Sequence, residues 1–150
     1  MAGFIIRKGE DENDVMLAEL TNTTIAIGDL VFRPAGLRNW QKATTAAAIK
    51  VFQLKGVALE AIATAADSTI KIRLVNPLQL WEVESANNSN VTHNGQRQIL
   101  TDENTVNNTG TDSASSTAIV VQVNGVGAVA DKKLLVRFGE STGFDPDATA

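Results

Sequence analysis

The strongest structural signal in the sequence is the run 69–74, TIKIRL, in which apolar and charged side chains alternate. Alternate residues of a β-strand face the same side of a sheet. Ile70, Ile72 and Leu74 therefore share one face, and Lys71 and Arg73 share the other. A period of two predicts a strand with one buried side.

Comparable strand patterns recur along the chain, with turns rich in Asn, Gly, Asp and Pro between them. We expect strands over 24–27 and 30–32, with a turn at Gly28-Asp29 between them, and over 51–54, 57–62, 78–83, 96–100, 117–123 and 132–138. Residues 41–49 are ambiguous, because alanines favour a helix and threonines a strand. Asn124-Gly125 predicts the tight turn of a hairpin between the last two strands. The sequence thus predicts a mainly β fold with a small barrel-like or sandwich-like core of the tulip type.

Changes in composition suggest how the chain is organised. Residues 1–20 read as an extended N-terminal arm and 21–84 as a first β lobe. The polar stretch that begins at Ser85 suggests a boundary, so 85–150 is expected to form a second β lobe with a flexible C-terminal tail. Within this lobe, residues 101–116 are almost wholly polar and predict a long exposed loop.

The N-terminal arm carries the first candidate contact residues. Phe4, Ile5 and Ile6 form an apolar tip, Arg7 follows, and the acidic stretch 9–14 separates this tip from the first predicted strand. Folding the tip back into the chain's own core is expected to bury those charges at high cost. We therefore expect the four residues to dock on a neighbouring subunit or on another protein.

Two tryptophans are the other candidate contact residues. Aromatic side chains combine a large apolar area with few rotatable bonds, which suits interface anchors. Trp40, flanked by polar residues, is the better interface candidate, and ordinary core packing is the alternative for both. Trp81 follows Leu80, so both faces of that strand are apolar and one of them is expected to meet the second lobe or another subunit.

The residues needed for catalysis are scarce. The chain has no cysteine, no tyrosine and one histidine, His93. The run 139–143 matches G-x-S-x-G, but a nucleophile elbow needs a following helix and a histidine downstream.

The run 125–130 matches a loose dinucleotide fingerprint without room for the helix that it requires. Asp11 and Asn13 resemble the start of a calcium loop that lacks its Gly and Glu. We expect no enzyme activity, no cofactor and no metal.

The charge balance limits the partners. The chain of 150 residues has 13 Lys+Arg and 17 Asp+Glu, a formal net charge of −4. Coating nucleic acid needs concentrated positive charge, so no nucleic-acid partner is expected.

No apolar run approaches the roughly 20 residues that span a bilayer. The apolar stretch at the N-terminus is too short for a signal peptide, because the charged residue Arg7 follows it at once. We expect no membrane partner and synthesis in the cytoplasm.

Residues 18–31, AELTNTTIAIGDLV, residues 55–62, KGVALEAI, and the stretch from Val123-Asn124-Gly125 through Val136 share a pattern of strands and turns. In this pattern they resemble, in that order, the opening strand, the middle segment and the closing hairpin of the capsid decoration (cement) proteins of tailed bacteriophages. The likeness is spread over roughly residues 18–138 and lies in strands and turns.

This resemblance implies a β-rich, non-enzymatic virion protein that stabilises the head from the outer capsid surface. It implies the major capsid protein as partner and a homotrimer, with a dimer as the alternative. By position alone it implies capsid contact through Phe4 to Arg7. Two other readings stay open: another phage structural β protein, in a tail tube or fibre, and a carbohydrate-binding β domain.

Overall fold

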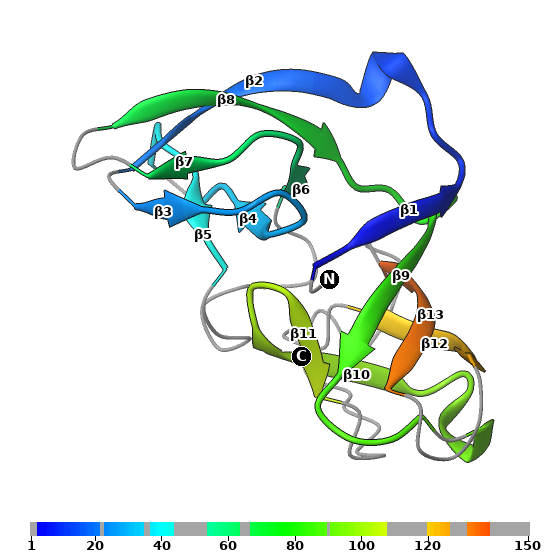
Figure 1. The fold of residues 1–150 in the computed structure, drawn as a ribbon. Helices are drawn as coiled ribbons and strands as arrows, with labels where there is room; N and C mark the ends of the chain where they lie inside the picture. Colours follow the sequence, from blue (N-terminus) through cyan, green and yellow to red (C-terminus); the bar gives the residue numbers. More distant parts are fainter. Residues whose placement is uncertain are drawn as a thin grey trace.

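A computed structural model describes residues 3–21, 23–34, 37–43, 54–63, 67–89, 91–107, 120–126 and 132–138. The described chain is mainly β, as predicted (Figure 1). Its strands are β1 (Ile5–Lys8), β2 (Val15–Leu20), β3 (Thr24–Ile25), β4 (Leu30–Phe32), β5 (Gln41–Lys42), β6 (Lys55–Ala58), β7 (Ile62–Ala63), β8 (Ser68–Leu74), β9 (Leu80–Ser85), β10 (Arg97–Asp102), β11 (Thr105–Asn107), β12 (Val120–Val126) and β13 (Lys133–Phe138). Two 3-10 turns, η1 (Glu12–Asp14) and η3 (Val91–His93), interrupt them.

The first sheet is antiparallel, with strand order β2-β8-β6-β4-β5. β8 is the strand predicted from the alternation at 69–74, and Ile70 and Ile72 are buried while Lys71 is exposed. A short ribbon of β3 and β7 lies beside this sheet (Figure 1). The alternation thus predicts which side of β8 is covered.

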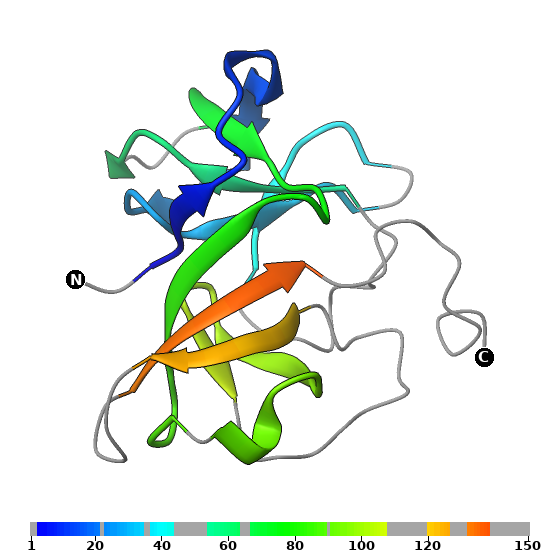
Figure 2. The same ribbon diagram turned by 90° about the vertical axis from the view of Figure 1, so that its right-hand side faces the viewer.

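The second sheet closes into a barrel. Its order is β9-β11-β10-β12-β13, and β13 pairs with β9 to complete a ring of five strands. β1 pairs antiparallel with the first half of β9, at Leu80–Glu82, and β11 pairs with its second half, at Glu84 and Ser85 (Figure 2). The β9–β11 pair is parallel, unlike the other pairs of this sheet. Closure removes most free strand edges, which would otherwise be open to unwanted pairing.

One hydrophobic core joins the two sheets. Leu30, Phe32, Ala43 and Val57 of the first sheet region pack with the interior of the barrel. The barrel and the N-terminal segment contribute Phe4, Trp81, Val83, Leu100, Val106, Val120, Leu134, Val136 and Phe138. A second cluster fills the first sheet: Ala18, Leu20, Ile25, Val31, Trp40, Ala58, Ile70 and Ile72. Because the first cluster draws on both sheets, each sheet buries apolar surface of the other.

The strands change sheet earlier than the polar stretch at Ser85 suggests. β8 belongs to the first sheet and β9 to the second, so the crossover lies at residues 75–79. β9 itself, predicted in the first lobe, forms part of the barrel. The expected arm over 1–20 is also divided: β1 pairs with β9, and β2 pairs with β8. These residues are built into both sheets.

Two local predictions need correction. Part of the loop predicted at 101–116 is a hairpin, because β10 runs to Asp102 and β11 covers Thr105–Asn107. Asn124-Gly125 does not form the turn: both residues pair with β13, next to a register shift in β12. Tertiary pairing outweighs local turn preference at these places. The antiparallel pairing of the last two strands is confirmed, and residues 108–119, 127–131 and the tail from 139 lie outside the described residues.

Candidate interaction surface

Phe4 does not reach outward, as the sequence led us to expect, but lies in the chain's own core with 3% of its surface exposed. Its ring centroid is 5.3 Å from that of Phe138 and 6.4 Å from that of Trp81. Trp81 and Phe138 meet edge to face at 6.0 Å. Such pairs add to the stabilisation from burial alone. Trp81 is therefore a core residue, which was the alternative to an interface role.

Backbone contacts fix the N-terminal segment in place. Phe4 N donates a hydrogen bond to Gly28 O at 2.8 Å, and β1 continues along β9. Ile5 and Ile6 are half-buried, whereas Arg7 is exposed and pairs with Glu82 Oε1 at 2.7 Å. The charge argument for an outward arm was wrong, because the acidic stretch after this segment runs over the surface and its burial is not required.

Trp40 links β2 to the segment just before β5. It forms a parallel bridge with Leu20: Trp40 N donates to Glu19 O at 2.8 Å, and Thr21 N donates to Trp40 O at 3.0 Å. Its side chain is buried in the second hydrophobic cluster. Of the six predicted contact residues, Arg7 alone is fully on the surface of the described chain. Contact of any of the six with a capsid or a second subunit stays a prediction.

The crossover between the sheets forms an ordered turn at residues 76–79, which we name the crossover turn. Leu78 N donates to Asn76 Oδ1 at 2.9 Å, and Asn76 N donates to Gln79 Oε1 at 2.9 Å. Gln79 N also donates to Asn76 O at 3.3 Å. Pro77 restricts the backbone between them. This turn presents Leu78 with 81% of its surface exposed.

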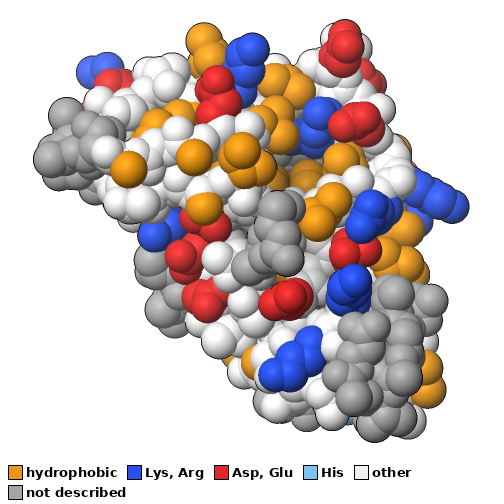
Figure 3. Space-filling model, viewed as in Figure 1, with side chains coloured by type: hydrophobic (Ala, Val, Ile, Leu, Met, Phe, Trp, Pro, Cys, Tyr) orange, Lys and Arg blue, Asp and Glu red, His pale blue; other side chains and the backbone are white. Residues whose placement is uncertain are grey.

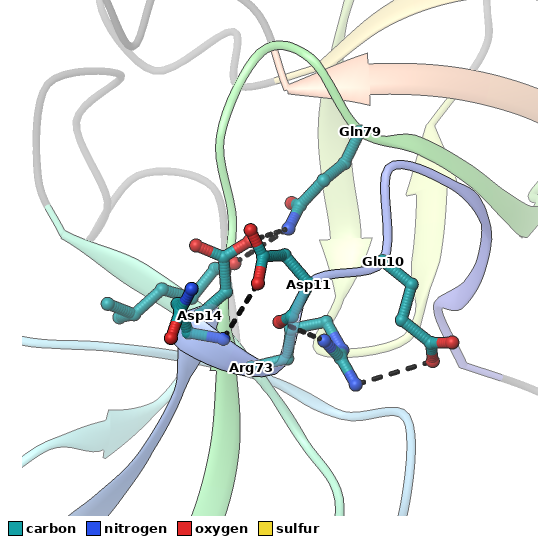
Figure 4. Close-up of polar contacts among 7 residues, drawn as sticks. Glu10, Asp11, Asp14, Arg73 and Gln79 are labelled. Carbon is teal, nitrogen blue, oxygen red and sulfur yellow. Dashed lines mark hydrogen bonds and ion pairs between the residues drawn. The ribbon is translucent and has the colours of Figure 1, made fainter.

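Gln79 anchors the crossover turn in the interior and is fully buried. Its Nε2 donates to Asp14 Oδ2 at 3.2 Å and to Leu74 O at 3.1 Å (Figure 4). Its Oε1 also accepts a hydrogen bond from the indole N–H of Trp81 at 3.3 Å. All the polar atoms of this amide are therefore used, as a buried amide requires.

The acidic stretch folds over Arg73 beside this turn (Figure 4). Arg73 lies on the outer face of β8, as predicted, yet only 7% of its surface is exposed. Its guanidinium donates to Asp11 O at 2.8 Å and contacts Glu10 Oε2 at 3.3 Å. The stretch read as part of a free arm is thus attached to the first sheet. Asn76-Pro77 in the sequence predicts a turn there, but nothing in the sequence indicates its partners.

Two buried ionisable groups have shifted pKa values. Burial raises the pKa of Asp29, although hydrogen bonds from Ala26 N and the Asn104 side chain act in the opposite direction. Burial lowers the pKa of Lys55 to about 8. They do not form part of a metal-binding cluster: within the described ranges, no three His, Asp or Glu side chains could hold an ion together. Residues 139–143, with the G-x-S-x-G match, lie outside those ranges.

Comparisons with known proteins add no assignment. No protein-family model matches the chain, and neither the curated proteins nor the solved structures contain a match. The helical turns in the described part of the chain, η1 and η3, have three residues each, and no helix there could cross a bilayer.

Proposed function

We propose that this protein is a non-enzymatic structural protein of a tailed-phage virion, which binds the outer surface of the assembled capsid and stabilises it. Its partner would be the major capsid protein, and it would act as a homotrimer, or as a dimer. Binding only the assembled state would shift the assembly equilibrium toward the intact head. Copies that contact several capsid subunits at once would gain further from multivalency.

One structural observation supports this proposal. Two of the segments that resemble decoration proteins, 18–31 and 55–62, lie side by side although they are far apart in sequence. β4 pairs with β6 and β3 pairs with β7. Gly28 N donates to Ala58 O and Ala58 N donates to Asp29 O, both at 2.9 Å. These two segments of the resemblance therefore fall on one continuous structural unit, as a shared fold would require, whereas the third ends in β13 of the barrel.

The carbohydrate-binding alternative receives less support. Sugar-binding domains commonly use exposed aromatic platforms with polar partners. Among the described residues, Trp40 and Trp81 are 4% and 1% exposed, and Phe4, Phe32 and Phe138 are also buried; Phe52 and Phe144 lie outside the described ranges. A tail-tube or fibre role has no specific observation in its favour, since the barrel of the second sheet is closed on itself.

The decisive experiment adds the purified protein to phage heads that lack their decoration protein. We expect saturable binding at repeated sites in an electron-microscopy map, and decorated heads that resist heat or chelator better than bare heads. Binding with no gain in head stability would remove the cementing role. If the protein binds none of the expanded phage heads that are tested, the proposal is contradicted.

A further inference from the structure

One glutamine in the barrel is buried without a hydrogen-bond partner for its side chain. Gln98, on β10, has 1% of its surface exposed, and neither its Nε2 nor its Oε1 is hydrogen-bonded within the described part of the chain. Buried amides are almost always paired, because each unpaired polar group costs free energy. Gln79, which is also buried, shows the usual state, since all its polar atoms are used. Gln98 therefore weakens the barrel where it lies.

Apolar side chains surround Gln98 on the inner wall of the barrel. Gln98 and Leu100 are the two buried residues of an alternating pattern in β10, so both face inward. Across the seam to β12, Gln98 lies opposite Val120, and Val120 lies opposite Phe138 on β13. All three apolar neighbours belong to the first hydrophobic cluster. None of them has a side-chain atom that could accept or donate a hydrogen bond.

A second buried glutamine of the same seam is directed to another partner. Gln122 lies two residues beyond Val120 on β12, and its Nε2 donates to Asn94 Oδ1 at 2.9 Å. Its backbone N donates to Gln96 O at 3.0 Å, and Gly95 N donates to Gln122 O at 2.7 Å. These two backbone hydrogen bonds join β12 to the residues just before β10. Their amide protons therefore report whether this seam is closed.

Apolar side chains meet on the inside of other seams of the barrel. The pairs are Leu100 with Val106 across β10 and β11, Val83 with Leu134 across β9 and β13, and Val120 with Phe138 across β12 and β13. Opening these seams would expose apolar surface to water and bring no compensating hydrogen bond. Opening the seam between β10 and β12 would also hydrate the Gln98 amide, which offsets part of the cost.

We propose that Gln98 makes the seam between β10 and β12 the place where the barrel opens locally. The amide lacks a partner among the described residues when the barrel is closed and bonds to water when it is open, so opening costs less free energy at this seam. The hairpin of β10 and β11 stays attached to the first sheet at its tip, where Leu30 N donates to Glu103 O at 2.8 Å. This conformational device goes beyond the proposed function and does not depend on it.

Amide hydrogen exchange measures the opening of individual seams. The Gln122 amide reports on the seam between β10 and β12, and the Ser85 amide, which donates to Lys132 O at 2.7 Å, reports on the contact of β9 with the start of β13. In the unchanged protein, we expect the Gln122 amide to be at least tenfold less protected than the Ser85 amide. The opposite order of protection would overturn the proposal.

Gln98→Met removes the amide and keeps a side chain of similar length. We expect it to raise the equilibrium constant for folding at least tenfold in urea unfolding, which corresponds to about 1.4 kcal/mol. It should also slow exchange at Gln122 at least tenfold more than at Ser85. The matched control is Gln79→Met, which should lower the stability, because it leaves the indole N–H of Trp81 without its acceptor.

The signs of these changes decide between the alternatives. If Gln98→Met is less stable than the unchanged protein, the amide is hydrogen-bonded in solution, as by an ordered water, and the device is overturned. If Gln98→Met is more stable but exchange slows equally at Gln122 and Ser85, the seam is not a place of local opening. These measurements use the isolated protein without phage heads, so either negative result leaves the proposed function standing.

Discussion

The backbones of Gly3 and Gly28 are in direct contact: a Cβ atom placed on Gly3 would lie 2.9 Å from Gly28 Cα. Both glycines have positive φ, at 111° and 94°. The contact brings Phe4 N to Gly28 O and places the Phe4 ring against Trp81 and Phe138. The N-terminal segment thereby ties the first sheet to the barrel. This contact determines how several substitutions should act.

Gly3→Ala should be strongly destabilising, because it combines an unfavourable φ with a backbone overlap that no side-chain movement relieves. Strain at positive φ alone costs about 1–3 kcal/mol. The matched control is Gly95→Ala, with φ of 87° but no heavy atom within 4 Å of the added Cβ. Urea unfolding should show a clearly larger loss for Gly3→Ala. Equal losses would mean that the Gly3–Gly28 contact does not hold.

Phe4→Ala should lower the free energy of unfolding by about 3–5 kcal/mol, the usual range for a buried phenylalanine. Deletion of residues 2–8 should be at least as damaging, since it also removes β1 from β9. The control is Leu17→Ala, an exposed site where a change within about 0.5 kcal/mol is expected. An unchanged melting temperature after the deletion would restore the free-arm interpretation.

Lys55 should make stability rise with pH. Its pKa falls from the ordinary 10.5 to about 8 on folding, so between these pH values the unfolded chain binds more protons than the folded one. Stability is therefore reduced below pH 8 and recovers as pH approaches 10.5, by roughly 3 kcal/mol in total at 1.4 kcal/mol per pKa unit. Urea unfolding from pH 7 to 10 measures this slope. Lys55→Met should abolish it, whereas Lys71→Met, at an exposed position of β8, should retain it.

Asn104→Ala should loosen the contact between the β10–β11 hairpin and the first sheet. Asn104 donates to the buried carboxylate of Asp29 at 3.3 Å, and Lys42 pairs with Glu103 beside it at 3.4 Å. Loss of a donor to a buried acceptor costs about 1–3 kcal/mol. Thr101→Ala, exposed on the same hairpin, serves as the control. Equal stability of the two variants in urea would show that the Asn104–Asp29 hydrogen bond contributes nothing.

Binding to heads should change little when salt is added. The chain carries a net charge of only −4, and acidic and basic side chains are interspersed on the face shown in Figure 3. Apolar contact and hydrogen bonds are therefore expected to dominate over long-range charge attraction, which salt screens. Titrations onto heads at low and moderate salt measure this. A steep loss of affinity would show that charge pairing dominates instead.

Local sequence patterns predicted the class of the fold and its clearest strands. The alternation at 69–74 required one covered face whatever the neighbours of that strand, and β8 has it. Polar turns and β-branched residues likewise indicated β4, β9 and β13. These features depend on residues two positions apart, and for that reason the sequence alone determines them.

The tertiary structure decided which strands meet and which side chains remain on the surface. Phe4 became buried because the edge of β9 was open to β1 and because Gly3 and Gly28 permit close approach. Arg73 became covered by Glu10 and Asp11, which lie 63 and 62 residues earlier in the sequence, and Leu78 stayed exposed. Such outcomes depend on pairings between distant segments, whose free energies no local pattern encodes.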